Sequence, residues 1–166
     1  MGALPDRSLQ RVTVPGGVEI HFTEEGAGLP LVFVHGGSNV SGYTADPVYD
    51  GAALARSANA VVVTANYRLD VLGYFQMPPL HTGTQPYTGN YALLDNVQAL
   101  RFIQNNIASF GGNAGNVTLM GQSAGAINAL ALLVAPQAAG LFHKLVPVSG
   151  GISLATNLPP GSIPTL

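Results

Sequence analysis

Four short apolar runs constrain the fold of this chain more than any other feature of its sequence. Each run is four or five residues long and is apolar at nearly every position rather than at alternate positions. Such runs predict β-strands that are covered on both faces, which is typical of a parallel sheet. The runs are 31–34, 60–64, 117–120 and 145–148.

Helical patterns lie between these runs. One apolar stripe has helical spacing and consists of Leu93, Val97, Leu100, Ile103 and Ile107. Glycines at 111 and 112 predict its end, and a second helix is predicted over 124–134, where the chain is apolar nearly all round. A shorter helix is expected after a capping Asp50. Strands that alternate with helices predict an α/β fold with right-handed crossovers.

An antiparallel hairpin is predicted before the first apolar run. Residues 11–14 and 18–23 flank the turn Pro15-Gly16-Gly17, and apolar residues alternate in the second arm. We expect the hairpin at the far edge of a mostly parallel sheet. No repeat or linker divides the chain, so residues 1–166 are predicted to form a single domain.

Composition excludes several classes of protein. The chain is 47% hydrophobic with a mean hydropathy of +0.31, a balance opposite to that of disordered chains. A net charge of −2 argues against a nucleic-acid partner. The most apolar helical stretch, 127–135, is about half the ~20 residues that cross a bilayer, and residues 1–10 lack the apolar core of a signal peptide. With no cysteine and four widely separated histidines, we expect no disulfide, metal or cofactor.

The pentapeptide GQSAG at 121–125 lies between a predicted strand and a predicted helix. In a G-x-S-x-G turn of this kind, the serine is strained and exposed, and small residues are needed where strand and helix nearly touch. The helix N-terminus also directs free N–H groups toward negative charge beside the serine. The pattern predicts that Ser123 is a catalytic nucleophile.

A second element, His35-Gly36-Gly37-Ser38, follows the run 31–34. Acyl transfer passes through an oxyanion that backbone N–H groups stabilise, and one such donor is worth about 3–4 kcal/mol. The loop after an earlier strand and the residue after the nucleophile supply these donors. We therefore predict an oxyanion hole formed by Gly37, Ser38 and Ala124.

Several further segments occur in one family in the same order. They are HGG at 35–37, YDG at 49–51, NYR at 66–68, GNY at 89–91, LD at 94–95, FGG at 110–112, GNVT at 115–118, LFHK at 141–144 and SG at 149–150. With GQSAG, they make the chain from about Leu31 onward resemble the central part of type-B carboxylesterases, the cholinesterase-like α/β-hydrolases. The resemblance implies an α/β-hydrolase fold, truncated after about the sixth strand, and the hydrolysis of small-molecule esters through an acyl-enzyme.

The chain departs from the family pattern at four places. Ser38 stands where a third glycine is usual, and its side chain can narrow or reshape the loop. Gln122 stands where glutamate is commoner, which removes a negative charge beside the nucleophile. Asp70 replaces a glycine, and Asn113-Ala114 replaces Asp-Pro.

A general base is not evident from the sequence. The family order places an acid and a histidine after the serine, but the residues after Ser123 contain no Asp or Glu and one histidine, His143. His143 precedes the strand 145–148, so we place it at the opposite edge of the sheet from Ser123. His35 and His81 are the candidate substitute bases. The alternative interpretation is that His35 braces the loop and that His81 is exposed to solvent.

Two hypotheses therefore stand. One is a carboxylic ester hydrolase, and the alternative is a catalytically incomplete fragment or a non-enzymatic, cholinesterase-like binding module. We also expect the strand 145–148 to be an uncovered sheet edge through which copies of the chain self-associate. A nucleotide-binding domain is disfavoured because neither GxGxxG nor a P-loop follows a strand.

Overall fold

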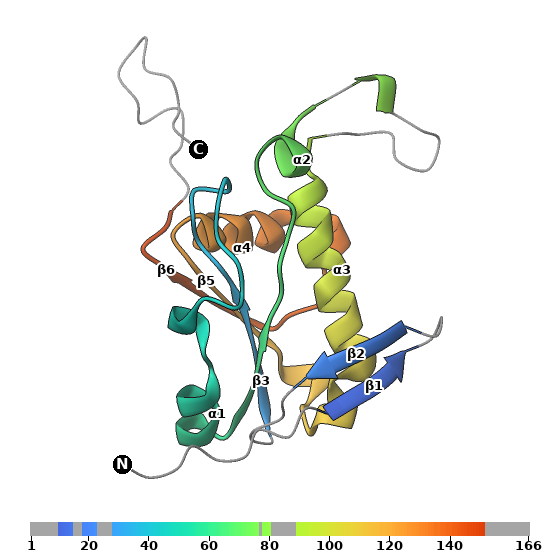
Figure 1. Ribbon diagram of the computed structural model, residues 1–166, viewed down its shortest axis with the longest axis vertical. Helices are drawn as coiled ribbons and strands as arrows, with labels where there is room; N and C mark the ends of the chain where they lie inside the picture. The colour runs from blue at the N-terminus through green and yellow to red at the C-terminus, as the bar shows by residue number, and fades with distance from the viewer. Residues whose placement is uncertain (1–9, 15–17, 23–27, 77, 81–88, 152–166) are drawn as a thin grey trace.

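The structure is a computed structural model that describes residues 10–14, 18–22, 28–76, 78–80 and 89–151 (Figure 1). Its centre is a four-stranded parallel sheet in the order β4-β3-β5-β6. The strands are β3 (Leu29–Val34), β4 (Ala60–Thr64), β5 (Thr118–Gln122) and β6 (Lys144–Val148). Each matches one of the four apolar runs, and the predicted parallel sheet is confirmed.

Within the described ranges, four α-helices connect and cover these strands. They are α1 (Ala52–Ala58), α2 (Asp70–Tyr74), α3 (Tyr91–Asn106) and α4 (Ala124–Val134). Short 3-10 turns span Pro47–Tyr49, Pro78–Leu80, Ile107–Phe110, Ala114–Asn116 and Pro136–Ala138. Helix α3 passes into the turn 107–110 and stops at Gly111, whose φ of 77° is left-handed. None of the described helices is long and apolar enough to cross a membrane.

The strand order places the helices in two layers. The chain passes from β3 through α1 to β4 in one direction, and then through α3 to β5 and α4 to β6 in the other. Right-handed crossovers therefore put α1 on one face of the sheet and α3 and α4 on the other (Figure 1). The core lies between the sheet and α3, where Leu100, Ile103 and Leu119 are almost fully buried.

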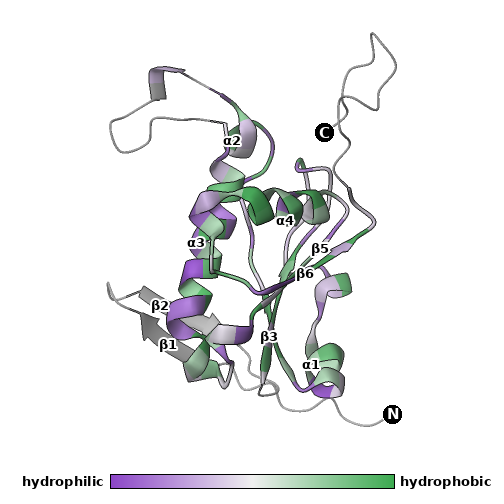
Figure 2. Cartoon of the chain, turned by 180° about the vertical axis from the view of Figure 1, so that it is seen from behind, coloured by the Kyte–Doolittle hydropathy of each residue, from purple (hydrophilic) through white to green (hydrophobic). Residues whose placement is uncertain are grey.

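Helix α4 is less buried than its sequence predicts. Its buried face packs on β5 and β6, but Leu133 and Val134 are 60% and 76% exposed. Figure 2 shows α4 as hydrophobic along most of its length. Because the sequence of α4 is apolar on every side, it does not indicate which face packs on the sheet and which face is exposed among the described residues.

The N-terminal hairpin is confirmed as antiparallel. Strands β1 (Gln10–Val14) and β2 (Val18–Phe22) pair in the register Val12↔Ile20. The hairpin forms a separate two-stranded sheet, so its expected place at the edge of the main sheet is wrong. His21 lies in β2.

Candidate active site

The candidate site lies at the carboxyl edge of the sheet, between β3 and β5. The chain leaves these neighbouring strands in opposite directions, and the switch point between such strands is where open α/β sheets bind their ligands. The parallel register pairs Val34 with Gly121. The loop that begins at His35 and the turn that contains Ser123 therefore start side by side.

Ser123 occupies a strained turn between β5 and α4. Its backbone has φ 55° and ψ −122°, and it is the residue that immediately precedes the helix. Its N–H donates to the Val148 carbonyl at 2.9 Å, and its carbonyl accepts from Ala126 and Ile127 at 2.9 and 3.2 Å. Such strain in a residue other than glycine costs about 1–3 kcal/mol and persists only where the surroundings enforce it.

The two glycines of the pentapeptide are required by close backbone contacts. A Cβ on Gly125 would meet the carbonyl oxygens of Val34 and His35, and a Cβ on Gly121 would meet the backbone of Gly125 and Ala126, all closer than 3.0 Å. The predicted tight packing of strand against helix is present, and it presses the start of α4 onto the end of β3.

The loop after β3 turns sharply through three residues with positive φ. These are Gly37 at 109°, Ser38 at 56° and Asn39 at 61°. The Gly37 carbonyl accepts hydrogen bonds from the N–H groups of Val40 and Ser41, each at 3.0 Å. These bonds close a tight turn over Ser38 and Asn39.

This loop lies directly against the Ser123 turn. A Cβ built on Gly36 would lie 3.2 Å from the Cβ of Ser123. Among the described residues, no group accepts a hydrogen bond from the N–H of Gly37, Ser38 or Ala124. The structure therefore brings the nucleophile candidate to the loop predicted to carry the oxyanion donors and leaves those donors without partners there.

His35 is packed under the loop. Its side chain is only 2% exposed, its ring stacks on Tyr67 with centroids 4.4 Å apart, and its Nδ1 lies 2.8 Å from the Gly36 carbonyl. Its Nε2 has no partner within the part of the chain that the structure describes. No hydrogen bond joins His35 to Ser123 there. Its surroundings are those of a residue that braces the loop.

The other histidines do not join the described site. His143 contacts the opposite end of β5, where its Nδ1 accepts from the Val117 N–H at 3.1 Å, in agreement with its predicted place. His81 lies outside the described residues. The described ranges contain no group of three His, Cys, Asp or Glu side chains that could hold a metal ion.

Sequence reasoning missed a chain of polar contacts below the loop. Asn128 of α4 donates from Nδ2 to Asn39 Oδ1 at 2.9 Å and accepts at Oδ1 from the Tyr74 hydroxyl at 3.0 Å. Tyr67 donates to the His35 carbonyl at 2.7 Å. Asn128 is the one polar residue in the otherwise apolar helix 124–134, and that isolation is the signal that could have indicated it.

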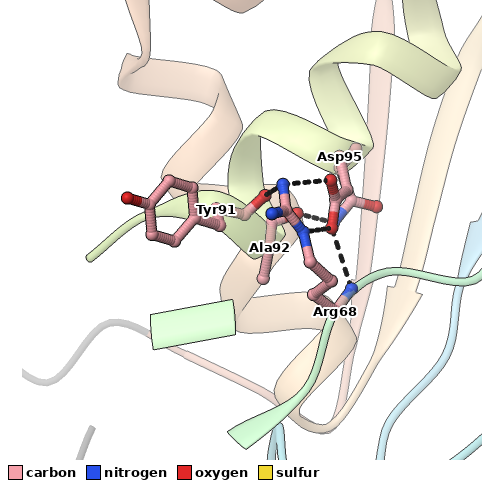
Figure 3. Close-up of polar contacts among 5 residues, drawn as sticks. Arg68, Tyr91, Ala92 and Asp95 are labelled. Carbon is pink, nitrogen blue, oxygen red and sulfur yellow. Dashed lines mark hydrogen bonds and ion pairs between the residues drawn. The ribbon is translucent and has the colours of Figure 1, made fainter. Parts of the chain in front are cut away.

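An ion pair holds the segment before α2 against α3. Arg68 and Asp95 form a two-pronged pair in which Nε and Nη2 reach the carboxylate at 2.8 and 2.7 Å (Figure 3). The Arg68 N–H also donates to Asp95 at 2.9 Å, and the guanidinium lies over the Tyr91 ring. The pair joins residues that are 27 positions apart in the sequence.

Relatives of known name match this chain over most of its length. The model of the Carboxylesterase family matches residues 12–160. The chain is 48% identical to a medium-chain fatty acyl-CoA hydrolase precursor of Anas platyrhynchos over 77% of this chain and 22% of the relative. It is 46% identical to a human cocaine esterase, again over 77% of this chain and 22% of the relative. The chain thus spans about a fifth of the length of these relatives.

Solved structures give the same result. A Geobacillus stearothermophilus carboxylesterase superposes with a TM-score of 0.66 at 41% identity, over 70% of this chain and 24% of that one. A PNB esterase superposes with a TM-score of 0.68 at 38% identity, over 76% of this chain and 26% of that one. The predicted α/β-hydrolase fold is confirmed, and the chain belongs to the carboxylesterase family.

Proposed function

We propose that this chain is part of a carboxylic ester hydrolase in which Ser123 is the nucleophile. The observation that carries the proposal is the strained backbone of Ser123, at the start of α4 and directly against Gly36. A hydroxyl held this way stands at a helix N-terminus beside a loop of N–H groups, the arrangement that acyl transfer needs.

The proposed reaction has two steps. The Ser123 Oγ attacks the acyl carbon, its proton passes to a base, and the alcohol leaves with a proton as the acyl-enzyme forms. Water then attacks the acyl-enzyme and releases the carboxylic acid. The N–H groups of Gly37, Ser38 and Ala124 stabilise the oxyanion in both steps. This assignment is supported by the fact that none of the three N–H groups has an acceptor among the described residues.

The substrate class follows from the family and from this chemistry. The relatives are named as esterases or as an acyl-CoA hydrolase, so we propose a small-molecule carboxylic ester as substrate. The neutral Gln122 beside Ser123 adds no charge to the turn.

For the base, we propose that His35 braces the loop and does not take the serine proton. Its near-complete burial and its contact with the Gly36 carbonyl support this role. His81 remains the candidate substitute base within this chain.

The alternative function is that of an incomplete hydrolase or a binding module. It is favoured by one observation: among the described residues, no histidine, aspartate or glutamate side chain hydrogen-bonds to Ser123. Loss of a triad partner costs about 10⁴–10⁶-fold in kcat, so a well-formed serine turn alone does not ensure turnover.

A serine-directed phosphonate distinguishes the two. The folded chain is incubated with an aryl phosphonate and its intact mass is read, with Ser123→Ala as the control. Stoichiometric labelling that the control lacks supports the hydrolase, and loss of labelling in His81→Ala but not in His35→Ala then identifies the base. A folded chain that remains unlabelled contradicts the hydrolase and supports the alternative.

We further propose that copies of the chain associate through β6. This strand is at one edge of the described sheet, and Val146 on it is 41% exposed. Unpaired strand edges pair readily with other strands. Sedimentation velocity should therefore detect an oligomer that Val146→Lys weakens, with the exposed Val48→Lys as a matched control. A monomer at all concentrations would exclude the association.

A further inference from the structure

We infer that Asn128 is a positioning residue that holds the oxyanion loop in place through Asn39. The inference rests on the proposed function, in which Gly37 and Ser38 supply oxyanion donors. Asn128 itself touches no reacting atom. It acts on the loop through the side-chain contact between its Nδ2 and Asn39 Oδ1.

The loop needs such a constraint because its backbone is strained. Ser38 and Asn39 follow each other with φ of 56° and 61°, a region that side chains other than glycine adopt at a cost. The Ser38 side chain makes no hydrogen bond to another described residue that would offset this cost. The hydrogen bonds from Val40 and Ser41 to the Gly37 carbonyl span the pair. A contact from outside the loop adds to them in holding this conformation.

Asn39 is contacted by three residues from outside the loop. Its Oδ1 accepts from Asn128 of α4 at 2.9 Å and lies 3.5 Å from the Tyr67 hydroxyl. Its carbonyl accepts from the Asp70 N–H, at the start of α2, at 2.7 Å. In Figure 1 the loop after β3, α2 and α4 all lie toward the same end of the molecule. The strained residue is thus tied to both helices beside the site.

Asn128 is suited to hold Asn39 because its own position is fixed. Its side chain is 3% exposed, and the Tyr74 hydroxyl donates to its Oδ1 at 3.0 Å. That contact orients the amide so that Nδ2 faces Asn39. Asn128 also lies little more than one helical turn after Ser123, so it fixes the loop relative to the helix that begins at the nucleophile.

If Asn128 positions the oxyanion loop, it should behave differently from a residue that only packs in the core. If Asn128 offsets strain at Ser38, then Ser38→Gly, which removes the strain, should rescue the loss caused by Asn128→Ala. The matched control is Asn96→Ala, because Asn96 is also buried, at 4% exposure, but its side chain bonds, among the described residues, only to the Ala92 carbonyl of its own helix.

Two readouts test the inference. The first is the second-order rate of Ser123 phosphonylation by a p-nitrophenyl phosphonate, which should fall about tenfold in Asn128→Ala, since small misplacements of catalytic groups cost up to about 10²-fold. The second is amide hydrogen exchange of Val40 and Ser41, whose N–H groups bond to Gly37, and it should accelerate while exchange in α3 stays unchanged. Ser38→Gly should restore most of both.

The outcomes separate this inference from the proposed function. If the wild type is never labelled, the proposed hydrolase fails, and hydrogen exchange alone still decides whether Asn128 holds the loop. An unchanged rate and exchange in Asn128→Ala, an equal loss in Asn96→Ala, or no rescue by Ser38→Gly overturns the inference. If Asn128→Ala does not fold, Asn39→Ala replaces it, because it removes the acceptor without relieving the strain of the loop, and Asn39→Asp, which keeps the acceptor, should lose less.

Discussion

The backbone N–H of Ser123 donates a 2.9 Å hydrogen bond to the carbonyl oxygen of Val148, at the end of β6. The pairing of Gln122 with Val148 leads directly into this bond. A Cβ on Gly150 would meet the Ser123 carbonyl and the Ala126 side chain, so the segment after β6 also packs on the turn. The strand β6 and the residues after it therefore support the strained backbone of Ser123.

Gly125→Ala should destabilise the fold strongly. The new methyl group would meet the carbonyl oxygens of Val34 and His35, which belong to the backbone and cannot move aside without shifting β3 or α4. We expect a loss of about 2–4 kcal/mol in the free energy of unfolding, measured by urea denaturation. Gly151→Ala is the control, because its methyl group would meet no atom of the described residues within 4 Å, and its effect should stay within about 0.5 kcal/mol. Equal losses in the two variants would contradict the close packing.

Ser123→Gly should stabilise the protein while it abolishes phosphonate labelling. Glycine adopts φ 55° and ψ −122° without the strain that serine carries, so we expect a gain of about 1 kcal/mol in the free energy of unfolding relative to Ser123→Ala. Thermal unfolding followed by circular dichroism measures the difference. Ser57→Gly, in the last turn of α1, is the matched control and should destabilise by up to about 0.5–1 kcal/mol. The same sign in both variants would indicate that Ser123 is not strained.

Patterns in the sequence predicted the strands and helices that are determined by their own residues and by the adjoining turns. The bounds of β4 and α4 agree with the apolar runs, because continuous apolarity and the adjoining turns mark both. Strand β5 extends to Gln122, beyond its apolar part, because its ladder with β6 continues to Val148. Helix α2 was not predicted, since its five residues depend on contacts with α3 and with Asn39 rather than on their own periodicity.

The same limit applies to the site. A motif with a strand before it and a helix after it was enough to predict the turn at Ser123 and the adjoining loop, because both features are local. The contact between Asn39 and Asn128 joins residues that are 89 positions apart, so the isolation of Asn128 in an apolar helix could single out that residue but could not identify its partner. The pairing of Asp95 with Arg68 was missed for the same reason.

The pair of Arg68 and Asp95 should make the fold sensitive to acid. Burial alone would raise the pKa of the Asp95 carboxyl, but hydrogen bonds from the Arg68 side chain and N–H, and its charge, outweigh burial and lower it. A carboxyl whose folded pKa is depressed adds stability above its unfolded pKa of about 3.9, and this is lost as the pH falls through the folded pKa. We therefore expect Asp95→Asn to cost about 0.5–1 kcal/mol at neutral pH, because the pair is partly exposed, and to cost less below about pH 3.

Urea denaturation at several pH values checks this expectation. Arg68→Lys should lose part of the same stability, because lysine cannot form the two-pronged contact seen in Figure 3. Arg101→Lys, on the exposed side of α3, is the control and should unfold as the wild type does. A cost of Asp95→Asn that is the same at every pH would show that the ionised pair contributes nothing.

Burial of two tyrosines should make the fold sensitive to alkali. Burial raises the pKa of Tyr74 to about 12, although its hydrogen bond to Asn128 opposes the shift, and burial also raises the pKa of Tyr67. A neutral hydroxyl favoured in the folded state adds stability that is fully present below the unfolded pKa of about 10 and disappears as the pH rises to the folded pKa. The free energy of unfolding should therefore fall between about pH 10 and pH 12, with Tyr74 contributing about 1 kcal/mol because solvent reaches part of its ring.

Tyr74→Phe should flatten that fall and, by leaving Asn128 Oδ1 without its donor, cost about 1 kcal/mol near pH 8. Urea denaturation across this range tests both effects, and a Tyr74→Phe curve parallel to that of the wild type would rule out the alkaline one.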